Sequence, residues 1–173
     1  MAPVTHDLLR LNVGFIIHQT IGYSRDFPIE IPAVRLSPDL EVFDMDGLAL
    51  VTRTTQGLLL QMKMGAFSTV ECARCLKQFS QELEINVTDL YAFSPDSATE
   101  SGLLLPETGI IDLGPVVREE MSLAVPINPV CSTECKGLCP ICGNDLNQTT
   151  CNHENEFIDP RLDKLKLLLE EEQ

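Results

Sequence analysis

The architecture of this chain is clearest in residues 57–93, which read GLLLQMKMGAFSTVECARCLKQFSQELEINVTDLYAF. Apolar and polar residues alternate over 58–66 and again over 79–93, which is the period of a half-buried β-strand. Cys72 and Cys75 stand between the two runs, where a hairpin would turn. The segment therefore predicts two antiparallel strands with a pair of thiols at their turn.

Shorter runs of the same kind precede this hairpin. Residues Ile29–Leu36 and Leu48–Thr55 are rich in apolar and β-branched residues, which favours strands. Pro38 and the Asp46-Gly47 pair predict turns between them. Together with the hairpin, these runs predict an antiparallel meander with one covered face.

Helical signals lie at both ends of the chain and after the hairpin. Leu8–Gln19 fits either a short helix or a strand, and we prefer the helix. After a polar loop at 94–109 and a short strand at 110–113, proline suits the first turn of a helix that begins near Pro115. The leucines that follow Asp159 and Pro160 predict an amphipathic C-terminal helix.

The predicted fold class is α+β. It is an antiparallel β-meander sheet covered by one or two helices, followed by a small C-terminal zinc-knuckle segment and a C-terminal helix. We expect two parts: residues 1–130 as the sheet domain with the Cys72/Cys75 knuckle, and 131–173 as the cysteine-rich segment and final helix.

The seven cysteines carry the strongest chemical signal, because five of them fall within CSTECKGLCPICGNDLNQTTC, residues 131–151. With His153 they make four close pairs of soft ligands, namely Cys72/Cys75, Cys131/Cys135, Cys139/Cys142 and Cys151/His153. Eight such ligands are the number that two closed tetrahedral zinc sites need. The sequence CPICG also has the form of a zinc knuckle, in which the glycine can adopt a positive φ.

Loop length favours one partition of these ligands. The eight-residue loop GNDLNQTT closes a site from Cys139, Cys142, Cys151 and His153. The remaining thiols, Cys131 and Cys135, would then join Cys72 and Cys75. The alternative is one zinc on Cys131, Cys135, Cys139 and Cys142, with Cys72 and Cys75 free. Disulfides are disfavoured in a reducing cytoplasm and by the odd number of thiols, and closed four-ligand sites are structural.

Composition limits the classes of function. Twenty-six acidic residues against 12 basic ones give a formal charge of −14. The chain therefore lacks the general attraction to phosphate that supports non-specific nucleic-acid binding, and any RNA contact must be local or pass through a basic protein. We find no apolar run of membrane-spanning length, no basic leader, no phosphate-binding loop and no catalytic zinc motif. These observations predict a cytoplasmic protein that is not an enzyme and has no small-molecule substrate.

Three cations stand beside the thiols: Arg74, Lys77 and Lys136. They are candidates for contact with RNA or with a partner protein. The interpretation that we prefer is that they offset the negative charge of a thiolate–zinc centre from just outside the ligands. The sequence leaves both interpretations open.

Four segments resemble a known bacterial family. They are ECARCLKQF (71–79), GIIDLGPVVREEMSLAVPINPVC (109–131), CKGLCPICGNDLN (135–147) and DPRLDKLKLLL (159–169). The resemblance is to the YceD-like proteins, called large ribosomal RNA subunit accumulation proteins. It implies a non-enzymatic role in making or stabilising 23S ribosomal RNA in the cytoplasm. The implied partner is ribosomal RNA or a ribosome-assembly protein, contacted directly or indirectly, and zinc is implied to stabilise the fold.

A second hypothesis comes from another class of protein. Cysteines near Arg74 and Lys77 are expected to have lowered pKa values, which is typical of redox-reactive thiols. The alternative function is therefore a thiol-based redox sensor or a zinc-releasing, chaperone-like protein.

Overall fold

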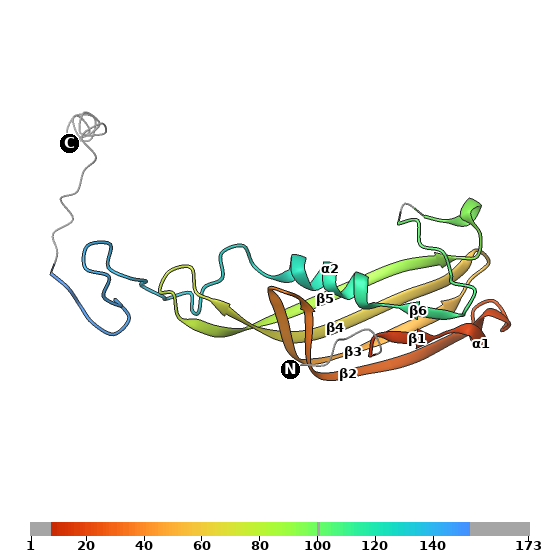
Figure 1. The fold of residues 1–173 in the computed structure, drawn as a ribbon, viewed down its shortest axis with the longest axis horizontal. Helices are drawn as coiled ribbons and strands as arrows, with labels where there is room; N and C mark the ends of the chain where they lie inside the picture. Colours follow the sequence, from red (N-terminus) through yellow and green to blue (C-terminus); the bar gives the residue numbers. More distant parts are fainter. Residues whose placement is uncertain (1–7, 100, 153–173) are drawn as a thin grey trace, which may run out of the picture.

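The computed structural model describes residues 8–99 and 101–152. Its elements in chain order are β1 (Arg10–Asn12), α1 (Gly14–Ile17), β2 (Ser24–Ser37), β3 (Leu40–Arg53), β4 (Gly57–Glu71), β5 (Gln78–Ala92), the 3-10 turn η2 (Pro95–Ser97), β6 (Ile110–Asp112) and α2 (Gly114–Ala124). The predicted α+β class is confirmed, and Figure 1 shows the long sheet with the cysteine-rich segment beyond one of its ends.

Four long strands form one antiparallel sheet in the order β2-β3-β4-β5. Each strand has 14 or 15 residues, so the sheet is about 50 Å long at about 3.4 Å per residue. The β4–β5 pairing runs without a break from Gly57 opposite Ala92 to Glu71 opposite Gln78. This is the hairpin that the alternation predicted, and its turn carries Cys72 and Cys75.

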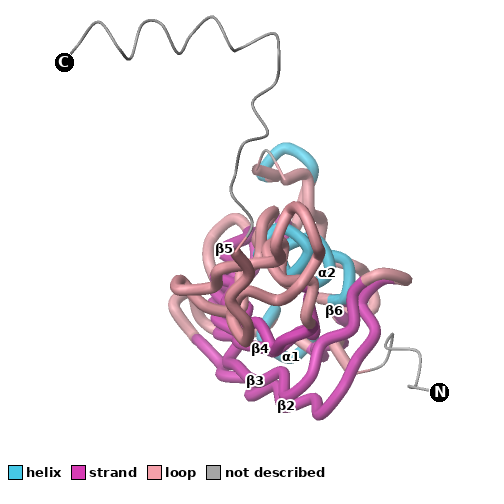
Figure 2. Tube along the Cα trace, turned by 90° about the vertical axis from the view of Figure 1, so that its left-hand side faces the viewer, coloured by secondary structure: helices cyan, strands magenta, loops and turns pink. Residues whose placement is uncertain are grey.

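The core lies on one face of the sheet. Figure 2 shows the sheet curved around α2, α1 and β6, and β6 pairs with β1 in a short two-stranded ribbon. The helix α2 buries Val117 and Met121 there, and it contacts β5 and β2. Its first turn is fixed by Asp112, whose carboxylate accepts a hydrogen bond from the N–H of Gly114 at 2.8 Å. The predicted helix is thus confirmed, and it ends two residues before Pro126.

The preferred helix at Leu8–Gln19 is wrong over its first half. Leu9, Leu11 and Val13 are buried in alternation, because β1 pairs with β6 and the N–H of Leu113 donates to the carbonyl of Leu9. Only a single helical turn, α1, follows the strand. Tertiary pairing therefore overrides the apolar pattern that suggested a longer helix.

The turn predicted at Asp46-Gly47 is also wrong, since both residues lie inside β3. The turn predicted at Pro38 is confirmed, because the chain turns between β2 and β3 at Pro38-Asp39. A side chain at position 47 would collide with the backbone of Lys63 and Met64 on β4. The glycine therefore permits a close approach of two strands beside the bulge that follows Phe43.

The two outer strands of the sheet are β2 and β5. β2 contains Pro28 and Pro32, and proline occurs in strands where its missing N–H would face away from the ladder. No helix among the described residues is long and apolar enough to cross a membrane. The predicted C-terminal helix and His153 lie outside the described residues, so the division at residues 130 and 131 stays a prediction.

Candidate metal centres

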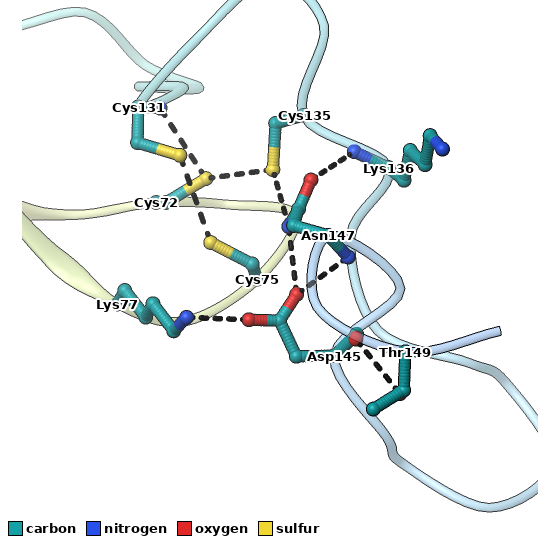
Figure 3. Close-up of polar contacts among 9 residues, drawn as sticks. All are labelled: Cys72, Cys75, Lys77, Cys131, Cys135, Lys136, Asp145, Asn147 and Thr149. Atoms are coloured by element: carbon teal, nitrogen blue, oxygen red, sulfur yellow. Dashed lines mark hydrogen bonds and ion pairs between the residues drawn. The ribbon is translucent and has the colours of Figure 1, made fainter.

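The turn of the β4–β5 hairpin meets the segment after α2, and four thiols come together there (Figure 3). Cys72 and Cys75 belong to the turn, whereas Cys131 and Cys135 belong to the later segment. Their four Sγ atoms all lie within 4.8 Å of one another. The Sγ–Sγ distance is 3.9 Å between Cys72 and Cys135 and 3.7 Å between Cys75 and Cys131.

These distances fit a metal ion and not a disulfide. A disulfide requires about 2.05 Å between the sulfurs. Four thiolates at about 2.3 Å from a tetrahedral zinc ion lie about 3.8 Å apart. Cys72, Cys75 and Cys135 are buried in a small cluster of their own, packed by Phe79 and Val130 and separate from the main core. The group therefore fits one closed tetrahedral site, which we name the hairpin centre.

A second group consists of Cys139, Cys142 and Cys151, whose Sγ atoms also lie within 4.8 Å of one another. We name it the distal centre. His153, the fourth ligand proposed from the sequence, lies outside the described residues. Three sulfurs with one position left fit a zinc site of the Cys₃His type. The seven thiols thus lie in the two groups that loop length favoured, and Cys72 and Cys75 do not stand apart, while their role as metal ligands stays a prediction.

The two knuckles have the same backbone turn. In the first, the N–H of Leu76 donates to the carbonyl of Cys72, and the N–H of Cys72 donates to the carbonyl of Lys77. In the second, the N–H of Gly143 donates to Cys139, and the N–H of Cys139 donates to Asn144. The equivalent residues Leu76 and Gly143 both have positive φ, 58° and 73°. A leucine in this conformation is strained, and nothing in the sequence signalled it.

Backbone donors prepare one thiol in each centre for ionisation. The N–H of Cys131, with that of Cys75, lowers the pKa of Cys72 to about 6, and its distance to the Cys72 sulfur is 3.4 Å. The N–H groups of Cys142 and Ile141 lower the pKa of Cys139 to about 7.

Other thiols in the same groups shift the opposite way. Desolvation and the neighbouring Cys135 thiol raise the pKa of Cys131 to about 12. The Cys139 thiol and desolvation raise the pKa of Cys151 to about 11. Several thiolates this close repel one another, so full ionisation of either set needs a bound cation.

The three cations predicted near the thiols have different surroundings. Arg74 donates from Nη1 to the carbonyl of Cys135 at 2.9 Å, which joins the hairpin turn to the later segment. Lys77 pairs with Asp145, with 2.5 Å between Nζ and Oδ2. Lys136 is exposed, and its backbone N–H donates to the side chain of Asn147 at 2.8 Å.

Asp145 and Asn147 were not identified from the sequence. They lie in the loop between Cys142 and Cys151, and Asn147 Nδ2 is 3.5 Å from the sulfur of Cys135 (Figure 3). Polar residues in a loop carry no spacing signal, so only their contact with the hairpin centre reveals them. Both groups of thiols could hold a metal ion, and an ion in the hairpin centre would connect remote segments of the chain.

Comparison with known proteins finds relatives without a described function. The chain is 33% identical to an uncharacterized protein of Mycobacterium tuberculosis over 179 residues, which cover 97% of this chain and 82% of that protein. It is 30% identical to the uncharacterized protein YlbN of Bacillus subtilis over 103 residues, covering 58% of this chain and 60% of YlbN. No solved structure matches the chain significantly.

Residues 60–169 match the family described as "Large ribosomal RNA subunit accumulation protein YceD". The matched region begins inside β4, and it includes the hairpin turn, α2 and all seven cysteines. That is more than half of the chain, and so this protein belongs to the YceD family.

Proposed function

We propose that this protein is a non-enzymatic factor that supports the accumulation of large-subunit, 23S ribosomal RNA in the bacterial cytoplasm. The observation that carries the proposal is the family match over residues 60–169. We further propose that two structural zinc ions hold the fold. Their ligands would be Cys72, Cys75, Cys131 and Cys135 in the hairpin centre, and Cys139, Cys142, Cys151 and His153 in the distal centre.

The geometry of the hairpin centre supports a structural role for its ion. Four sulfurs surround one point, so a bound ion would keep no open position for a water molecule or a substrate. The ion would supply positive charge to a set of thiols that cannot all ionise without it. It would also tie the hairpin turn to the segment that follows α2.

The charges favour a basic protein as the immediate partner. Arg74 and Lys77 are used within the protein, by Cys135 and Asp145, which leaves Lys136 as the candidate for contact with RNA or a partner. On the sheet face away from the core, Asp46 and Glu84 lie on either side of Gly65 in one cross-strand row. Such a surface attracts cationic protein segments more readily than a phosphate backbone.

Gene deletion tests the proposal directly. We expect the ratio of 23S to 16S ribosomal RNA to fall, with fewer free large subunits in sucrose gradients. A plasmid with the natural gene should restore the RNA ratio and the amount of free large subunits. A plasmid that encodes Gln148→Ala, a control variant at an exposed position, should restore them as well. An unchanged 23S level in the deletion strain would contradict the proposed function.

The alternative is a redox sensor or zinc-releasing, chaperone-like protein, and the lowered pKa values of Cys72 and Cys139 favour it. Dilute peroxide would then release the metal and expose apolar surface within minutes. Metal retained under peroxide, together with a defect in 23S RNA, would exclude this alternative.

A further inference from the structure

The loop between Cys142 and Cys151 belongs to the distal centre, yet its side chains contact the hairpin centre (Figure 3). Asn147 uses every polar group of its amide there. Its Nδ2 donates to the sulfur of Cys135 at 3.5 Å and to Asp145 Oδ1 at 2.7 Å, and its Oδ1 accepts from the N–H of Lys136 at 2.8 Å. A flipped amide would place oxygen against the Asp145 carboxylate, so these contacts fix its orientation.

Asp145 holds Asn147 in this position from the other side. Its Oδ1 accepts a second hydrogen bond, from the backbone N–H of Asn147 at 2.9 Å. Its Oδ2 pairs with Lys77, which lies directly after the hairpin knuckle. The carboxylate thus connects the loop of the distal centre to the turn of the hairpin centre.

The backbone makes the same connection. Leu138 lies next to Cys139, the first ligand of the distal centre, and its N–H donates to the carbonyl of Arg74 at 3.0 Å. At Gly137, which has a φ of +75°, a Cβ would lie 2.9 Å from that same carbonyl oxygen. Glycine is required here both for the conformation and for the close approach. The distal segment therefore rests on the hairpin knuckle itself.

We propose that the two metal centres are coupled and that Asn147 is the positioning residue through which they act. Metal in the distal centre orders the loop and holds the Asn147 amide against the Cys135 sulfur. This hydrogen bond stabilises the thiolate, so metal binds the hairpin centre more tightly. By linkage, metal in the hairpin centre strengthens binding at the distal centre by the same factor. The inference rests on the metal-binding part of the proposed function.

The test uses Co²⁺ as a spectroscopic probe on the full chain, with affinities from competition against a chelator. Asn147→Ala and the near-isosteric Asn147→Asp both remove the donor to sulfur, and outer hydrogen bonds of this kind change metal affinity by about 10- to 100-fold. We expect the Co²⁺ affinity of the hairpin centre to fall by this factor. We also expect its sulfur-to-cobalt charge-transfer band to move to lower energy, because the thiolate lone pairs lose a donor.

Two further variants isolate the coupling. Cys142→Ser disables the distal centre, and it should weaken the hairpin centre by a similar factor although it changes none of its ligands. Gln148→Ala, a neighbouring exposed position, should change neither affinity nor spectrum. Hydrogen exchange across β4 and β5 verifies that each variant keeps the sheet.

The outcomes separate the inference from the proposed function. Suppose that the chain binds two Co²⁺ ions, but that the Co²⁺ affinity of the hairpin centre does not change in Cys142→Ser or in both Asn147 variants. That result would overturn the coupling alone. A chain that binds neither Co²⁺ nor Zn²⁺ would overturn the coupling and the structural zinc together.

Discussion

The two knuckles share one backbone turn but stand in opposite surroundings. Cys72 and Cys75 follow a 15-residue strand, and the thiols that complete their group lie 56 and 63 residues further along the chain. Cys139 and Cys142 are grouped with Cys151, which belongs to the same short segment. The same local turn thus brings together thiols from remote segments in the hairpin centre, but thiols of one short segment in the distal centre.

The sources of stability differ accordingly. The hairpin knuckle stands on strands whose alternate residues are buried in the main core, among them Leu60, Met62 and Met64. Between residues 136 and 152, only Gly137 and Cys139 are buried. The distal segment therefore has almost no apolar burial of its own, and we expect a bound cation to supply most of its folding free energy.

Breaking the distal knuckle should have the largest effect. Structural zinc in zinc-finger peptides contributes an apparent 10–16 kcal/mol or so, far more than the side chains of 137–149 can replace. We expect Cys139→Ser to abolish hydrogen-exchange protection over that range while β2 to β5 keep theirs. Wild-type protein treated with a chelator should show the same pattern. Undiminished protection in the variant would mean that the segment folds without metal.

Breaking the hairpin knuckle should have a smaller effect on the fold. In Cys72→Ser we expect the β4–β5 pairing to remain, because all of its residue pairs, from Gly57–Ala92 to Glu71–Gln78, lie outside the turn that carries the thiols. We expect one metal ion per chain to be lost, Cys131 and Cys135 to become rapidly alkylated, and the thermal midpoint of the sheet to fall by a few degrees, about 2–4 °C. A collapse of the sheet itself would show that the clasp is required for folding of the whole chain.

Substitutions at the positive-φ residue of each turn should have opposite effects. A left-handed conformation costs a residue other than glycine about 1–2 kcal/mol. In Gly143→Ala the new methyl group meets no neighbouring atom, but the alanine acquires the cost of the positive φ, so we expect about 1 kcal/mol of destabilisation. Leu76→Gly relieves the strain, and it loses little burial because Leu76 is 57% exposed. Chelator midpoints should therefore move in opposite directions for the two variants.

The smallest effect is expected at the ion pair between the knuckles. Lys77 is half exposed, so Lys77→Met should lower the stability of the protein only slightly, and less at high salt. Lys77 also lowers the pKa of Asp145 below its ordinary 3.8. The contribution of the Asp145 carboxylate to the stability of the folded protein is therefore complete above pH 3.8. It is lost as the pH falls through the lowered pKa. A double-mutant cycle with Asp145→Asn at neutral pH, at low and high salt, measures the pair.

The sequence predicts those features that rest on short-range periodicity. Alternation in β4 and β5 located the hairpin, and the thiols at its turn followed from their position between the two runs. Pro115 and Pro126 likewise bracketed α2. Each of these signals lies within one element, where the side-chain pattern and the local backbone agree.

Features that depend on contacts between distant segments were missed. Gly47 looks like a turn residue, and only the close approach of β4 explains it. β1 exists because β6 pairs with it across about a hundred residues. Asn147 has no pattern at all until its amide is seen beside Cys135.

The two outer strands of the sheet differ in their proline content. The pyrrolidine rings of Pro28 and Pro32 interrupt the free margin of β2, so an incoming backbone would find a broken series of donors there. β5 contains no proline, and the segment that follows it reaches its outer margin at Ala92, through hydrogen bonds with Leu103 and Leu105. Any growth of this sheet by strand addition, in assembly or in aggregation, would therefore proceed from β5.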